Sequence, residues 1–168
     1  MLNKMWSLTS AVILALLMVW VWAYPKFWAG YEVHPVFGWS ELLSGISAMD
    51  PYVRWAAGAI TLASIVMLFI GPTRMLGAIL AAALSVFYLV LHSTPWLGLA
   101  IPSHEALTAG LAAGLTAEQI QAMSRGEDLH LVMTLVNGLM AAVVIAAEHT
   151  LRNEAREAKQ PRTTLVFS

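Results

Sequence analysis

The chain contains no cysteine and very little charge. Of its 168 residues only 11% are Asp, Glu, Lys or Arg, against about 25% in soluble globular domains, while 59% are hydrophobic. Without cysteine the chain cannot carry out dithiol chemistry, hold an iron–sulfur cluster through thiolates or form disulfides. These shortages exclude a membrane thiol oxidoreductase and indicate a protein whose partner is the lipid bilayer.

Several functional signatures are also missing. The net charge is −1 and no basic face is evident, which excludes nucleic acid as a partner. No charged residue lies near the middle of a long apolar run, whereas ion-coupled transporters and voltage sensors need ionisable groups there. No nucleophile with an oriented base and no glycine-rich phosphate loop is recognisable. We therefore expect no catalysis by this chain on its own.

Four apolar runs are present, and each is long enough to cross a bilayer as a helix. They cover residues 5–24, 52–70, 75–96 and 129–147. The first is interrupted by Trp20 and Trp22, so we interpret it as a retained span rather than a cleaved signal. An abrupt turn over Gly71–Arg74 joins the second run to the third. The sequence predicts an all-α integral membrane four-helix bundle over residues 1–150, with a charged tail over residues 151–168.

Two connecting segments are predicted to contain short helices on the outer side of the membrane. Residues 36–47 place apolar side chains on one helical face, which is typical of a short interfacial helix. Residues 103–128 form the one long polar connection between runs. In it, Thr116 and Gln119 have the spacing of a capping box that opens a short helix.

The second run opens with a recognisable helix start. Asp50 is predicted to be the N-cap, with Pro51 at the first helical position. Arg54 follows beside Trp55, and we interpret it as an interfacial anchor. The alternative is that Arg54 pairs with an outer carboxylate such as Asp50.

Basic residues predict the orientation of the spans. The side that holds both termini contains Lys4, Arg74, Arg152, Arg156, Lys159 and Arg162, whereas the other side contains Lys26, Arg54 and Arg125. Loops rich in lysine and arginine stay in the cytoplasm. Both termini are therefore predicted to be cytoplasmic, and the opposite side is the outer side.

Small residues recur at spacings of three and four along the runs. Such residues let helix backbones approach closely in lipid, where no hydrophobic force drives helices together. The residues predicted to pack helices against one another are Gly58, Gly77, Ala81, Ser85 and Gly138.

Four histidines fall on the predicted outer side: His34, His92, His104 and His130. The third run arrives at His92 and the fourth departs from His130, so antiparallel packing places these two at similar depth. Two imidazoles that face the interior can bind a metal ion or the iron of a b-type haem. The alternative is that each ring is hydrogen-bonded near its own helix end.

Tyr88 and Asn137 belong to the same outer half. Together with His92 and His130 they form a candidate site for a quinone or another lipid-soluble ligand. A cavity bounded by Tyr88, Asn137 and Trp96 would instead favour a protein that binds a lipophilic small molecule. The competing interpretation is that these polar side chains only link helices in lipid.

The hairpin between the second and third runs resembles a known family. The segments Ala57–Gly58, Phe69–Gly71 and Thr73–Ala78, with apolar residues between, resemble two spans of the DoxX-like family of small four-helix bacterial membrane proteins. A Gly-x-Thr-Arg turn often joins these spans. The resemblance implies a subunit linked to quinone or thiosulfate redox chemistry, or an accessory protein, in a bacterial inner membrane.

These observations lead to one leading hypothesis and two alternatives. The leading one is a small non-catalytic integral subunit or accessory protein of a larger inner-membrane complex, of an energy-converting or redox kind, with other membrane subunits as partners. The alternatives are a redox protein that binds haem b or quinone through the outer histidines, and a binding protein for a lipophilic small molecule.

Overall fold

The computed structural model describes residues 2–123 and 128–159, and most of these residues are helical. No strand occurs in those two ranges, which confirms the prediction of an all-α protein. Arg125 and Arg162, which contributed to the predicted charge distribution, lie outside the described residues.

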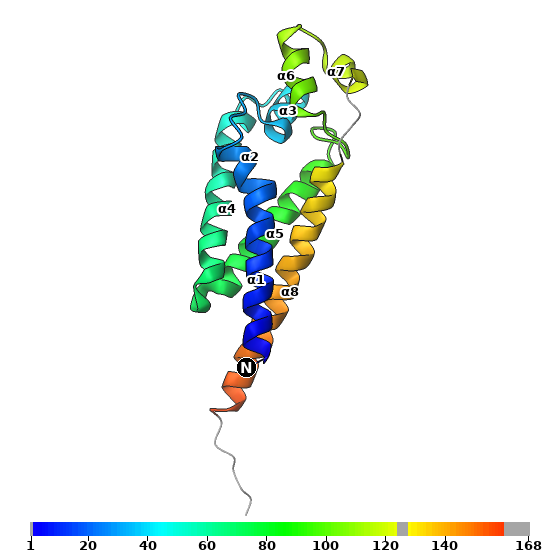
Figure 1. The fold of residues 1–168 in the computed structure, drawn as a ribbon. Helices are drawn as coiled ribbons and strands as arrows, with labels where there is room; N and C mark the ends of the chain where they lie inside the picture. The colour runs from blue at the N-terminus through cyan, green and yellow to red at the C-terminus, as the bar shows by residue number, and fades with distance from the viewer. Residues whose placement is uncertain (1, 124–127, 160–168) are drawn as a thin grey trace, which may run out of the picture.

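Within the described residues, four helical stretches are long and apolar enough to cross a membrane: Asn3–Phe27, Met49–Phe69, Gly71–His92 and Leu129–Glu157. Their parts are α1 (Leu2–Met18), η1 (Val19–Ala23) and α2 (Tyr24–Phe27); η2 (Met49–Val53) and α4 (Arg54–Phe69); η3 (Gly71–Thr73) and α5 (Arg74–His92); and α8 (Leu129–Glu157). Each stretch packs against two of the others: α1 contacts α4, α4 contacts α5, α5 contacts α8, and α8 contacts α1 (Figure 1).

The first long helix continues through Pro25, whereas the sequence predicted that the apolar run ends at Tyr24. A proline lacks the backbone N–H, and its ring crowds the carbonyl group one turn earlier. The π turn η1 widens the helix just before this proline, and the Tyr24 N–H donates to the Val19 carbonyl oxygen. The helix therefore reaches Phe27 and carries Lys26, which is only 2% exposed, in among the long helices.

Three short helices lie over one end of the long ones (Figure 1). They are α3 (Pro35–Ser44), α6 (His104–Ala112) and α7 (Ala117–Met123), and we call this the capped end. Gly45 ends α3 with a φ of +70°, the left-handed backbone that glycine adopts at helix C-termini. At α7, the Thr116 N–H donates to Gln119 Oε1 (2.8 Å) and the Gln119 N–H donates to Thr116 Oγ1 (3.4 Å), as in a capping box.

Two glycines lie where α5 approaches its neighbours most closely. A Cβ atom on Gly77 would come within 2.8 Å of the Ser64 carbonyl oxygen, and one on Gly138 within 3.3 Å of Ser85 Cβ. The Ser64 hydroxyl donates to the Gly77 carbonyl oxygen at 2.7 Å, which joins α4 to α5. A larger side chain at either glycine would push two helices apart.

The remaining residues predicted to pack helices are also enclosed. Ala81 is fully buried on α5, and the Ser85 hydroxyl donates to its carbonyl oxygen (3.0 Å). A Cβ atom on Gly58 would come within 2.5 Å of the Phe27 ring, so Gly58 makes room for an aromatic side chain from α2.

A buried ion pair joins the long helices at the other end, near the Gly71–Thr73 turn. Arg74 of α5 lies 3.1 Å from Glu148 of α8, whose side chain is 7% exposed. The Ser7 hydroxyl of α1 donates to the Glu148 carboxylate. Arg74 also donates to Ser7 Oγ (3.2 Å) and to the Leu68 carbonyl oxygen of α4 (2.9 Å). One guanidinium group therefore contacts the other three long helices.

We expect Glu148→Ala to lower the free energy of unfolding by about 3 kcal/mol, because removal of one partner leaves the other charge buried and uncompensated. Thermal unfolding in detergent measures this change. Glu157→Ala, at the exposed end of α8, is the matched control and is expected to stay within about 0.5 kcal/mol of wild type. Equal stability of Glu148→Ala and wild type would show that the ion pair is not structural.

Candidate functional site

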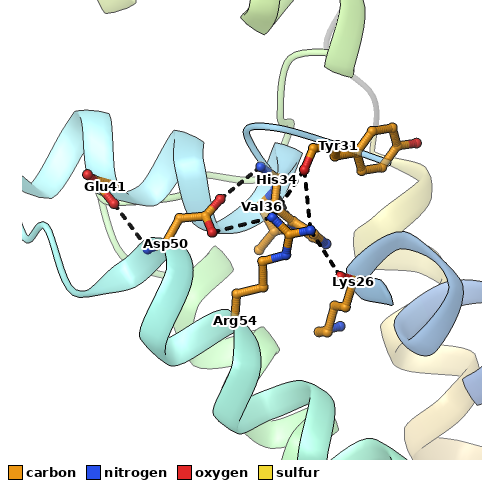
Figure 2. Close-up of polar contacts among 7 residues, drawn as sticks. All are labelled: Lys26, Tyr31, His34, Val36, Glu41, Asp50 and Arg54. Carbon is orange, nitrogen blue, oxygen red and sulfur yellow. Dashed lines mark hydrogen bonds and ion pairs between the residues drawn. The ribbon is translucent and has the colours of Figure 1, made fainter. Parts of the chain in front are cut away.

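Arg54, at the start of α4, holds the loop that precedes α3 (Figure 2). Its Nη2 donates to the Lys26 carbonyl oxygen (2.9 Å), and both Nη atoms donate to the Tyr31 carbonyl oxygen (3.3 and 3.4 Å). Nη1 also lies 3.5 Å from Asp50 Oδ1. Arg54 is 9% exposed, so these contacts replace water around a buried charge. The interpretation of Arg54 as an interfacial anchor is therefore wrong, and the alternative, pairing with Asp50, is correct.

Asp50 ties the same loop to α3. Its Oδ2 accepts a hydrogen bond from the His34 N–H (2.9 Å), and its own N–H donates to Glu41 Oε2 (3.0 Å) (Figure 2). Its backbone is extended (φ −125°, ψ 117°) and lies at a kink inside the η2 segment. The predicted helix start is confirmed in its backbone, since Asp50 is extended as an N-cap residue is and Pro51 follows it. The carboxylate does not cap the helix, because it binds Arg54 and the His34 N–H instead.

Lys26 points into the space between the long helices. Its Nζ donates to the Trp22 carbonyl oxygen at 2.7 Å and lies 5.3 Å from the ring centroid of Tyr88 and 5.8 Å from that of Phe37. Aromatic faces attract a cation, which offsets part of the cost of burying one. Sequence reasoning missed this role because it ended the helix before Pro25, and only a continuing helix puts Trp22 and Lys26 on one face.

His34 is the N-cap of α3. Its Nδ1 accepts a hydrogen bond from the Val36 N–H (3.2 Å), so the proton of the neutral ring lies on Nε2. Burial lowers the pKa of His34 well below its usual value of 6.5, and the charges of Lys26 and Arg54 lower it further. Its Nε2 has no hydrogen-bond partner among the described residues.

The structure brings His92, at the end of α5, next to His130, at the start of α8. His92 Nε2 lies 3.0 Å from His130 Nδ1, and His92 Nδ1 lies 2.7 Å from the Gly98 carbonyl oxygen. A carbonyl group only accepts, so in neutral rings His92 carries its proton on Nδ1 and accepts at Nε2 from the His130 Nδ1–H. His130 Nε2 is then unprotonated, and nothing in the described chain hydrogen-bonds to it.

This histidine pair does not fit a pair of axial haem ligands. Two nitrogens bound to one iron at about 2 Å each, on opposite sides of the metal, would be about 4 Å apart. The facing nitrogens of His92 and His130 are 3.0 Å apart and share a hydrogen bond, and the second nitrogen of His92 is bonded to Gly98. As placed here, His92 and His130 do not lie on opposite sides of one iron, and the haem b site stays a prediction.

The four histidines predicted as a metal set do not converge either. His104, at the start of α6, stacks on Tyr31 with ring centroids 4.0 Å apart, while His34 caps α3 and His92 binds His130. Within residues 2–123 and 128–159, no three His, Asp or Glu side chains are placed to hold a metal ion. The metal prediction is corrected because each ring is engaged by its own neighbours.

A cavity of about 350 Å³ lies beside His130 at the capped end. Its lining residues are Trp20, Val21, Pro25, Tyr31, His34, Pro35, Val36, Ile101, Leu129, His130 and Met133. The volume falls in the range of small-molecule sites, roughly 300–1,000 Å³. Two of the lining residues, Trp20 of η1 and Leu129 of α8, are 73% and 64% exposed, so this part of the cavity wall lies at the surface of the molecule.

Tyr88 and Asn137 are fully buried and are not among the residues that line this cavity. The Tyr88 ring packs edge-on against His130, with centroids 5.2 Å apart. In the described part of the chain, the Tyr88 hydroxyl and both amide atoms of Asn137 lack hydrogen-bond partners. The predicted ligand set is therefore divided: His130 lines the cavity, His92 contacts His130 from outside it, Tyr88 packs against the His130 ring, and Asn137 is buried away from the lining. His34, which belonged to the predicted metal set, also lines the cavity.

No family model, curated protein or solved structure matches the chain. The resemblance of its central hairpin to the DoxX-like family stays a prediction. What the protein does must therefore be argued from the geometry of the capped end.

We expect Arg54→Met to lower the free energy of unfolding by about 3 kcal/mol, because the Lys26 and Tyr31 carbonyl groups and the Asp50 carboxylate lose a buried donor. Thermal unfolding in detergent measures the change. Arg156→Met, on an exposed position of α8, is the control and should stay near wild type. A variant as stable as wild type would mean that Arg54 does not hold this loop.

The tautomers derived above are directly observable. In ¹⁵N-histidine-labelled protein at neutral pH, we expect His92 and His130 to carry their proton on Nδ1 and His34 to carry it on Nε2. Nitrogen chemical shifts distinguish the two forms, and single His→Gln variants assign the signals. A His130 ring protonated on Nε2 would contradict the hydrogen-bond direction from His130 to His92.

Proposed function

We propose that this is an integral membrane protein that binds a lipid-soluble ring compound of the quinone class, in either oxidation state, at its capped end. The observation that carries the proposal is the cavity beside His130, because it combines apolar walls, two exposed lining residues at the surface of the molecule and two histidines. Small-molecule sites have this character: mostly apolar, with a few placed polar groups that fix orientation.

The size and position of the cavity suit a flat ring with an apolar tail. The ring would lie beside His34 and His130, while the tail would leave past Trp20 and Leu129 into the bilayer. These two exposed side chains present an apolar rim of the kind that faces lipid. A fully water-soluble ligand would gain nothing from such a rim.

The orientation predicted from the sequence is part of the same proposal. The Arg74 side chain lies at the end opposite the capped end, where it contacts Ser7 and Glu148. By the positive-inside rule this end is cytoplasmic, with both termini, in a bacterial inner membrane. The cavity then lies in the outer half of the membrane.

A non-catalytic role accords with the cavity lining. Among the lining residues there is no carboxylate, lysine or hydroxyl nucleophile other than the phenol of Tyr31. Binding without turnover suits a small subunit or accessory protein of a larger redox or energy-converting complex, in which another chain carries out the chemistry. This assembly remains part of the proposal.

Filling the cavity tests the proposal. We expect the wild-type protein in nanodiscs to bind a decyl-substituted benzoquinone or its quinol, each titrated separately. Met133→Trp places an indole in the cavity and should weaken that binding at least about tenfold, because the ring is excluded. Leu139→Trp, on a lipid-facing position of α8 that is 69% exposed, is the matched control and should bind as wild type does.

Two outcomes would contradict the proposal: no binding of either form to wild type, or equal binding to wild type and Met133→Trp. Native mass spectrometry of protein extracted gently from its own membrane addresses the assembly separately. Other chains in the same particle would support the subunit role, and a ligand mass on the single chain would support binding without it.

A further inference from the structure

His130 is a cavity residue whose hydrogen-bonding polarity is set by its neighbours. The Gly98 carbonyl oxygen can only accept, so it fixes the proton of His92 on Nδ1. His92 Nε2 can then only accept, so it fixes the proton of His130 on Nδ1. The remaining nitrogen, His130 Nε2, is left as a lone-pair acceptor without a partner in the described chain.

The backbone that supplies this carbonyl group is itself held in place. Gly98 has a φ of +76°, a left-handed conformation that favours glycine, and its N–H donates to the Thr94 carbonyl oxygen (3.1 Å). The turn after α5 is thereby closed on itself. The acceptor that orients His92 is therefore a fixed part of the fold rather than a mobile side chain.

Both rings are neutral in this arrangement. Among the described residues neither His92 nor His130 hydrogen-bonds to a carboxylate. Lys26 Nζ lies 5.3 Å from the Tyr88 ring, which in turn contacts His130. A charged imidazole in this apolar region would be poorly solvated.

We propose that the cavity selects ligands that present a hydroxyl donor, so that it binds phenols and quinols in preference to ethers and quinones. This inference rests on the proposed function. A ligand hydroxyl would donate to His130 Nε2 and complete a chain of three hydrogen bonds in one direction, through His92 to Gly98. Bonds aligned in this way strengthen one another. A hydroxyl oxygen could also accept from the unpartnered His34 Nε2–H, whereas an ether or carbonyl oxygen could only accept there and would leave His130 Nε2 unpaired.

The test uses two air-stable probes that differ at one position, 4-heptylphenol and 4-heptylanisole. Each is titrated against the protein in nanodiscs, and each Kd is corrected for partition into empty nanodiscs. We expect wild type to bind the phenol about tenfold more tightly, because the ether leaves His130 Nε2 unpaired. The quinol and quinone forms of the decyl-substituted benzoquinone should rank in the same order.

The variant His92→Phe distinguishes a preference caused by the hydrogen-bonding direction of His130 from one caused by the larger size of the ether probe. His92 is not among the residues that line the cavity, so a preference caused by the extra methyl group of the ether would persist in this variant. If polarity is the cause, the freed His130 can place its proton on either nitrogen, and the ratio should fall to about twofold or less. His130→Gln, whose amide can present either polarity, gives a second test if His92→Phe does not fold. His149→Phe, on an exposed position at the other end, should keep the wild-type ratio.

The outcomes are distinguishable. Equal Kd values for the two probes in wild type, or a ratio unchanged in His92→Phe and His130→Gln, would overturn the donor preference while the ligand site stands. Failure of both probes and of both forms of the benzoquinone to bind would overturn the proposed function itself.

Discussion

A largely buried positive charge organises the capped end. The guanidinium of Arg54 is buried, and such a group is tolerated only where acceptors surround it. Those acceptors come from Lys26, Tyr31 and Asp50, so segments that are far apart in the sequence must meet at one point. The chain between α2 and α3 is thereby folded back over the start of α4. This return of the chain sets Tyr31 and His34 in the wall of the cavity.

A largely buried arginine organises each end of the molecule, but the two arginines hold different kinds of segment. Arg74 binds one carboxylate and one backbone carbonyl group of another helix, and Arg54 binds one carboxylate and two backbone carbonyl groups. Near Arg74 the bonds connect long helices directly, and the result is a rigid junction. Near Arg54 the bonds hold a loop, and the space beneath that loop remains partly open. Arg74 thus joins the long helices at one end, and Arg54 holds the loop over the cavity at the other. Between the two ends, glycines allow the long helices to pack closely.

The sequence predicted the long helices because hydropathy over about 20 residues is a local property that needs no knowledge of partners. The sequence also predicted that His92 and His130 lie at similar depth. His92 is at the end of one long helix and His130 is at the start of the next, and the two helices run antiparallel. Sequence reasoning failed where an outcome depends on distant residues or on one altered turn. Burial of Lys26 depends on the π turn before Pro25, and the role of Arg54 depends on carbonyl groups up to 28 positions away. Neither feature has a local pattern.

The histidine pair shows why proximity alone does not define a site. Two imidazoles at the same depth were compatible with haem, metal or quinone, and the sequence left these open. The choice depends on which nitrogens are already in use. His92 Nδ1 is hydrogen-bonded to the Gly98 carbonyl oxygen, and His92 Nε2 is hydrogen-bonded to His130 Nδ1. Of the four ring nitrogens a single one, His130 Nε2, is left without a partner in the described chain, and His130 lines the cavity. One free acceptor cannot hold a metal between two rings, but it can distinguish a hydroxyl group from an ether, and the chemistry of the site follows from that difference.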